Sequence, residues 1–90
     1  MSNKRDLKKK INCACADLFA ECIATSLYTG HPSQEDADAI LQLIIRTNDD
    51  FVRRISHPEP GIPAKKYFRI VEEDFTKRIV EIIDQIGNPG

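Results

Sequence analysis

The sequence predicts an all-α protein, a three-helix up-down-up bundle formed by a single domain over residues 1–90. The chain contains three long runs in which apolar residues recur every three or four positions, the spacing of one face of an α-helix. Short segments rich in proline and glycine separate these runs, and no stretch alternates apolar and polar residues as a strand does. We therefore expect helices over about 3–29, 34–56 and 64–86.

The first run is expected to be a helix that begins with a capping pair, Asn3 and Asp6. Gly30 supplies a left-handed stop, and Pro32 prevents the helix from resuming. The residues expected to face the core are Leu7, Ile11, Ala14, Cys15, Leu18, Cys22 and Thr25, with Phe19, Ile23 and Leu27 widening the stripe.

The second run has Ser33 as its N-cap and Asp36 at the reciprocal position. Its apolar steps alternate between four and three, which is typical of helices that pack at shallow angles. Asn48 is a polar residue within this stripe, and it could either fix the register of a bundle or bind a ligand. The expected stripe is Ala37, Leu41, Ile44, Asn48, Phe51 and Ile55.

The connection at 57–63 is expected to be stiff, since it contains three prolines and a glycine. Each residue before a proline is pushed out of the helical region, so no helix crosses this segment. Pro63 suits the start of the third helix, and the residues from Gly87 to Gly90 end it. Such stiffness suggests a surface on which a partner could dock. The core stripe expected for this helix is Ala64, Phe68, Val71, Phe75, Ile79, Ile82 and Ile86.

The charges of the chain are unevenly distributed, although the net charge of the 90 residues is only −1. Residues 1–10 carry +4, and the other eighty residues therefore carry −5. A basic end on an acidic chain differs from the broad basic face of nucleic-acid binders, so a nucleic-acid partner is not expected. No apolar run approaches the ~20 residues of a membrane span, which favours a cytoplasmic protein without a membrane partner.

Three cysteines are an unsuitable set for a disulfide framework. Cys13 and Cys15 are two residues apart on the predicted helix. Their side chains point about 200° apart, so they cannot both coordinate one metal ion. Cys15 and Cys22 share the apolar face and are expected to pack in the core. The acidic residues of the third helix lack a matching set on the second helix. We therefore expect no metal site and no cofactor.

The side chains best suited to binding or catalysis flank the stiff connection. They are Arg53, Arg54, His57 and Tyr67. The Arg53–His57 pair resembles the arginine–histidine motif of helical ribonuclease toxins of the HEPN class, but three residues intervene here instead of four to six. The arginines could instead pair with acids such as Asp49 and Asp50 on their own helix. The patch is thus either a partner or ligand site, or an ordinary solvated surface.

Four stretches together resemble a family of small uncharacterised all-helical proteins from anaerobic bacteria. They are KRDLKK at 4–9, DLFAEC at 17–22, RISHPEPG at 54–61 and KYF at 66–68. The resemblance covers nearly the whole chain. It implies an all-helical cytoplasmic protein and carries no assigned activity.

Broad apolar stripes on the first and third helices would remain partly exposed in a three-helix monomer, so we expect self-association as a homodimer. The function that this pattern favours is that of a non-catalytic interaction or regulatory protein. The alternative is a small helical enzyme or nucleotide-handling protein with a site near Arg53, His57 and Tyr67.

Overall fold

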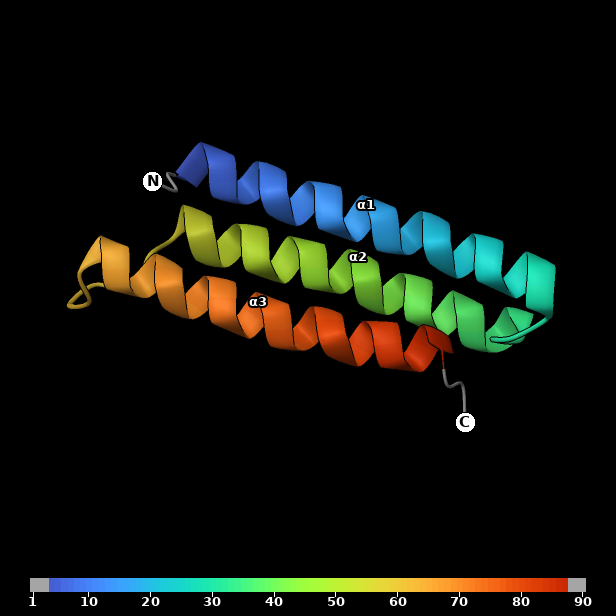
Figure 1. Ribbon diagram of the computed structural model, residues 1–90. Helices are drawn as coiled ribbons and strands as arrows, with labels where there is room; N and C mark the ends of the chain where they lie inside the picture. Colours follow the sequence, from blue (N-terminus) through green and yellow to red (C-terminus); the bar gives the residue numbers. More distant parts are fainter. Residues whose placement is uncertain (1–3, 88–90) are drawn as a thin grey trace.

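The computed structural model describes residues 4–87, which form three α-helices in an up-down-up arrangement (Figure 1). They are α1 (Lys4–Thr29), α2 (Gln34–Ser56) and α3 (Ala64–Gly87). The all-α bundle is confirmed, and no strand occurs within the described residues. The helix bounds agree with those expected to within one residue. The proposed cap at Asn3 and the stop residues 88–90 lie outside the described residues.

Helix α2 lies between the other two helices (Figure 1) and packs against both of them. Helices α1 and α3 contact each other least, and the molecule extends over 46 × 21 × 17 Å. The bundle is therefore held together mainly through α2, with α1 and α3 on its flanks. This arrangement leaves part of the surface of α1 without a covering helix.

The core consists of one buried stripe from each helix. Phe51 of α2 and Phe75 of α3 meet edge to face, with their ring centroids 5.3 Å apart, which is a favourable aromatic geometry. The buried apolar residues are Leu7, Ile11, Cys15, Leu18 and Cys22 of α1, Ala37, Ile40, Ile44, Phe51 and Ile55 of α2, and Tyr67, Val71, Phe75, Ile82 and Ile86 of α3.

The buried stripe of α2 differs from the stripe expected from its apolar residues. Thr47 is fully buried, whereas Asn48 and Leu41 are only half-buried. Because α2 packs against a helix on each flank, its buried side points between them, which turns the stripe toward Ile40 and Thr47. The expectation that Asn48 belongs to the central stripe was therefore wrong, whereas Leu41 packs against the core from the edge of the stripe.

Two further core assignments also differ from the structure. Ala64 is exposed because it is the first residue of α3, directly after the connection. Ile23 and Leu27 were expected to widen the buried stripe of α1, but both are exposed. In the expected bundle these residues would be covered by neighbouring helices. Here they lie at the edge of the contact between α1 and α2, where no third helix covers them.

The first connection contains the stop and cap signals that the sequence predicted. Gly30 has a φ of 75°, and its N–H donates to the Ser26 carbonyl at 2.9 Å. The Ser26 hydroxyl donates to the Pro32 carbonyl at 2.7 Å, and Pro32 is buried. The Ser33 hydroxyl accepts from the Asp36 N–H at 3.3 Å, which caps α2.

The second connection begins where the His57 N–H donates to the Arg53 carbonyl at 2.9 Å, closing α2. Gly61 has a φ of 93°, which glycine adopts far more easily than other residues. The Pro63 carbonyl accepts from the Tyr67 N–H at 2.9 Å, so α3 starts directly after this proline. Ile62 packs against the core and ties the connection to the bundle.

Replacing Thr47 by valine is expected to stabilise the protein. The Thr47 hydroxyl is buried and has no hydrogen-bond partner within residues 4–87, and such a group costs roughly 1–3 kcal/mol. Valine has nearly the same shape without the polar atom. We expect Thr47→Val to raise the free energy of unfolding by about 1 kcal/mol in urea denaturation.

The matched control is Thr76→Val on α3. The Thr76 side chain is exposed and its hydroxyl donates to the Glu72 carbonyl at 3.0 Å, so its free energy of unfolding should change by less than about 0.5 kcal/mol. A lower stability of Thr47→Val than of the wild type would contradict the assignment of an unsatisfied hydroxyl.

Candidate functional site

Two of the four residues that flank the second connection form contacts between α2 and α3. They are Arg54 and Tyr67. Tyr67 is buried, and its hydroxyl donates to the Arg54 carbonyl at 2.9 Å. The Arg54 guanidinium donates to the Asp74 carboxylate at 3.0 Å and lies 5.2 Å from the centre of the Phe51 ring. Each of these polar groups is engaged within the bundle, which supports a structural role.

The other two members of the patch face solvent. The Arg53 Nε lies 3.5 Å from Asp49 Oδ2 one turn earlier, and exposed pairs of this kind contribute only about 0.3–0.5 kcal/mol. His57 is exposed, and its backbone N–H closes α2. The four residues thus lie around one end of α2. None of them lines the grooves that α1 forms with α2 and with α3. Their role as a ligand or partner patch stays a prediction.

Replacing Tyr67 by phenylalanine tests the fastening of α2 to α3. The change removes the hydroxyl and leaves the Arg54 carbonyl without this donor, so we expect a loss of about 1 kcal/mol in the free energy of unfolding. Tyr28→Phe is the control. The Tyr28 side chain is 90% exposed, so this variant should keep almost the same free energy of unfolding as the wild type. Equal stabilities of the two variants in urea denaturation would refute the fastening role.

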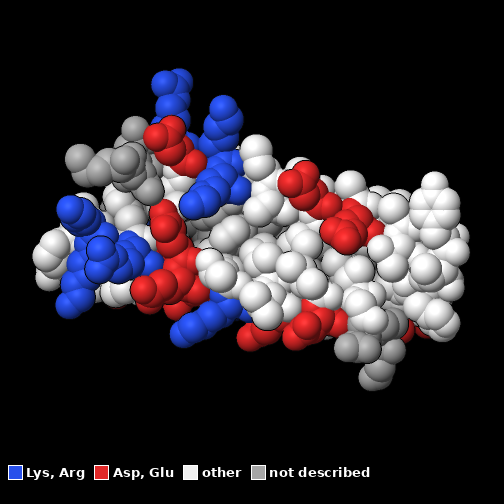
Figure 2. All heavy atoms as spheres, in the orientation of Figure 1, with Lys and Arg blue, Asp and Glu red and all other residues white. Residues whose placement is uncertain are grey.

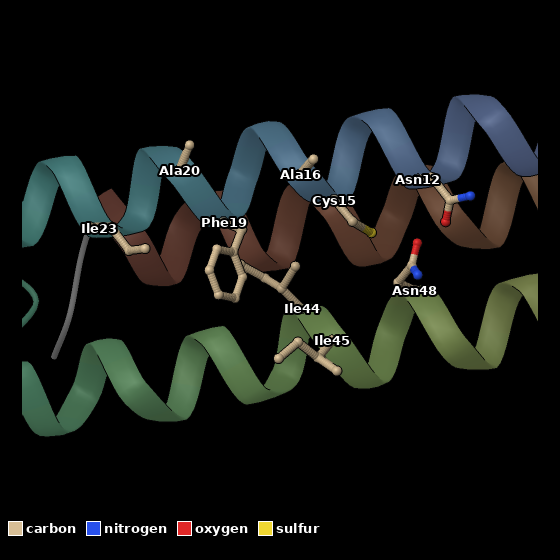
Figure 3. Close-up of a pocket in the computed structure, with 9 residues that line it drawn as sticks. All are labelled: Asn12, Cys15, Ala16, Phe19, Ala20, Ile23, Ile44, Ile45 and Asn48. Carbon is tan, nitrogen blue, oxygen red and sulfur yellow. The ribbon is translucent and has the colours of Figure 1, made fainter.

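A long apolar face runs along α1 and α2. It contains two grooves, of about 480 Å³ and about 400 Å³, which share Ile23 and so follow one another along the helices. Figure 3 shows the first groove, with Phe19 and Ile45 projecting into it from the two helices. We name this surface the α1–α2 face, formed by Asn12, Ala16, Phe19, Ala20, Ile23 and Leu27 of α1 and Leu41, Ile45 and Asn48 of α2.

Large apolar side chains on this face are in contact with water. Leu27 is 80% exposed, Ile45 is 52% exposed and Ile23 is 38% exposed. Full burial of such a side chain is worth about 1.5–3 kcal/mol, and the monomer forgoes the part of this free energy that corresponds to the exposed fractions. Contiguous apolar surface of this kind is typical of a binding site for another protein.

One end of the α1–α2 face is polar. Asn12 and Asn48 point toward one another across the groove, and their side-chain oxygens face each other (Figure 3). The Asn48 Oδ1 is buried and has no hydrogen-bond partner within residues 4–87. Asn48 therefore forms part of the wall of the groove, with its buried oxygen on the side of Asn12 (Figure 3).

A smaller groove of about 220 Å³ lies between α1 and α3. Of the three pairs of helices, this pair has the least contact. Its floor is apolar, and Lys10 and Glu72 contribute to its lining. Val80 of α3, which is 52% exposed, also lines it. This groove has less than half the volume of the first groove of the α1–α2 face.

The cysteines are free, as the sequence predicted, and Cys15 and Cys22 are buried in the core. Burial raises the pKa of both thiols. The Cys22 Sγ lies 3.9 Å from the Ala37 carbonyl oxygen, a weak contact between α1 and α2. Cys13 is exposed. No group of three or more His, Cys, Asp or Glu residues within the described chain is placed to bind a metal ion.

The three thiols are expected to react at different rates. The thiolate is the reactive form, and a raised pKa keeps Cys15 and Cys22 protonated to higher pH than a free thiol. Iodoacetamide at pH 8 should therefore modify Cys13 first, as read by peptide mass spectrometry. In guanidinium chloride all three should react alike. Equal rates in the folded protein would show that the core opens more readily than its packing implies.

The chain was compared with protein families, curated proteins and solved structures, and no match was found in any of the three comparisons. The resemblance to small helical proteins from anaerobic bacteria therefore stays a prediction. Within residues 4–87, none of the helices combines the length and apolar character needed to span a bilayer.

Proposed function

We propose that the protein is a small, non-catalytic interaction module of the cytoplasm that forms a homodimer through the α1–α2 face. One observation carries the proposal: Ile23, Leu27 and Ile45 leave large apolar areas exposed along a single continuous surface. The engagement of Arg54 and Tyr67 in contacts between helices supports a role without catalysis.

The size of the face suits a dimer. The broad side of a molecule 46 Å long and 21 Å wide measures about 970 Å², so it has room for the roughly 800 Å² that each partner contributes to a standard interface. The two α1–α2 grooves also exceed the α1–α3 groove in volume. A second copy presents the same apolar surface, so the two faces would shield one another from water.

Introducing a charge on the face is expected to dissociate the dimer. Ile45→Lys places an ammonium group in the apolar centre, where burial without a partner is costly. We expect the wild type to elute as a dimer at micromolar concentrations in size-exclusion chromatography with light scattering. The Ile45→Lys variant should elute as a folded monomer, with its helical content checked by circular dichroism.

Val80→Lys is the matched control, because Val80 is 52% exposed, as is Ile45, but lines the α1–α3 groove. This variant should remain dimeric. Dissociation by Val80→Lys together with an intact Ile45→Lys dimer would move the interface to the α1–α3 groove. A wild type that is monomeric up to high micromolar concentration would refute the proposal.

A further inference from the structure

The charges of the chain divide into three blocks along the sequence. Residues 1–10 carry +4, and residues 46–90 contain equal numbers of basic and acidic residues. Between them, residues 11–45 contain no Lys or Arg and five Asp or Glu residues, and thus carry −5 with neutral histidine. The charged residues of the basic block, Lys4 to Lys10, lie at the start of α1, while those of the acidic block lie in the rest of α1 and the first half of α2.

The fold places these two blocks toward opposite ends of the rod. Helix α2 returns antiparallel to α1, so its acidic start lies beside the end of α1 (Figure 1). On the side shown in Figure 2, the blue side chains gather toward the end where α1 begins, and the other end shows only red and white among the described residues. The pair of helices α1 and α2 is thus basic toward the end where α1 begins and acidic toward the opposite end.

The α1–α2 face has charged residues at both of its ends. Arg5 and Lys9 precede Asn12 at helical steps of four and three, so they continue the α1 side of the face. Asp38 lines the second groove at the other end. These three residues are exposed, and none of them forms an ion pair within residues 4–87.

We infer that the partner on the α1–α2 face is a second copy in antiparallel orientation, related by a two-fold axis across α1. This inference rests on the proposed dimer and adds its geometry. Antiparallel docking sets the basic end of each copy against the acidic end of the other, so opposite charges meet at both ends. Parallel docking would set +4 beside +4 and −5 beside −5, which costs free energy.

The distances along α1 agree with this orientation if the two-fold axis crosses α1 near position 18. Lys9 lies nine residues before position 18, about 14 Å at 1.5 Å per residue. Asp38 shares its groove with Ile23 and Leu27, which are five and nine residues after position 18, or about 8–14 Å. An axis near position 18 therefore brings Lys9 of one copy to about the same height along α1 as Asp38 of the other.

The centre of the proposed interface is suited to close contact between the two α1 helices. Ala16 and Ala20 flank position 18, and both are exposed and line the first groove. Their small side chains let two helix axes approach more closely than leucine or phenylalanine would. Each Phe19 then lies next to the axis, where it can pack against its counterpart.

Charge reversal at one or both ends tests the orientation. The variants are Lys9→Glu, Asp38→Lys and the double variant that contains both changes. In an antiparallel dimer either single change creates two like-charge contacts, so we expect the dimer Kd to rise about tenfold. The double variant restores opposite charges at both ends, and its Kd should return to within about threefold of the wild type. Analytical ultracentrifugation measures all four values.

Ionic strength supplies a second measurement on the same proteins. Screening weakens attraction and repulsion alike, so 0.5 M salt should loosen the wild-type and double-variant dimers and tighten those of the single variants. The control carries Lys65→Glu and Asp84→Lys, which reverse the same two charge types on α3, away from the face. Its Kd should match the wild type.

The outcomes separate the orientation from the dimer itself. If the wild type dimerises but Lys9→Glu and Asp38→Lys leave the Kd unchanged, the antiparallel arrangement is overturned while self-association stands. A wild-type dimer that tightens with salt would also overturn it, since that is the behaviour of a parallel pair. Absence of any dimer would refute the proposed function, and this inference with it.

Discussion

Packing of α1 and α3 on opposite flanks of α2 is the constraint on which the rest of the structure depends. Helices α1 and α3 contact each other least, so each depends on α2 for most of its burial. The fully buried Ile44 and Ile55 lie on α2, and Val71 and Ile82 on α3. Because one helix serves two neighbours, its buried side is broad, and a polar residue, Thr47, falls within it.

The same arrangement explains why an apolar surface remains. A helix in a closed three-helix bundle buries its stripe against two neighbours, whereas α1 packs mainly against one. Its stripe is wider than that single contact can cover, so Ile23 and Leu27 remain exposed. The apolar surface is thus a consequence of the open packing, and the second copy that we propose as its occupant would bring a charge pattern that complements it end to end.

The sequence predicted the helices well because their boundaries depend on local chemistry. Gly30, Ser33 and Pro63 act through backbone conformation and hydrogen bonds within a few residues, which the sequence displays directly. The burial of Thr47 in place of Asn48 could not be predicted, since it depends on where two other helices approach α2. The Tyr67 hydroxyl bond to the Arg54 carbonyl also escaped prediction, because it spans thirteen residues across the turn.

The affinity and the orientation of the proposed dimer would have different physical origins on the α1–α2 face. Burial of apolar side chains such as Ile23 and Ile45 is non-directional, so it would favour parallel and antiparallel pairs almost equally. Charges act over about 8 Å at physiological ionic strength and distinguish the two orientations at the ends of the rod. The buried Asn48 oxygen, which has no hydrogen-bond partner within residues 4–87, lowers the stability of each copy and does not depend on the orientation of the pair. In the proposed dimer, apolar area would therefore drive association, while the charged residues at its ends would select one arrangement.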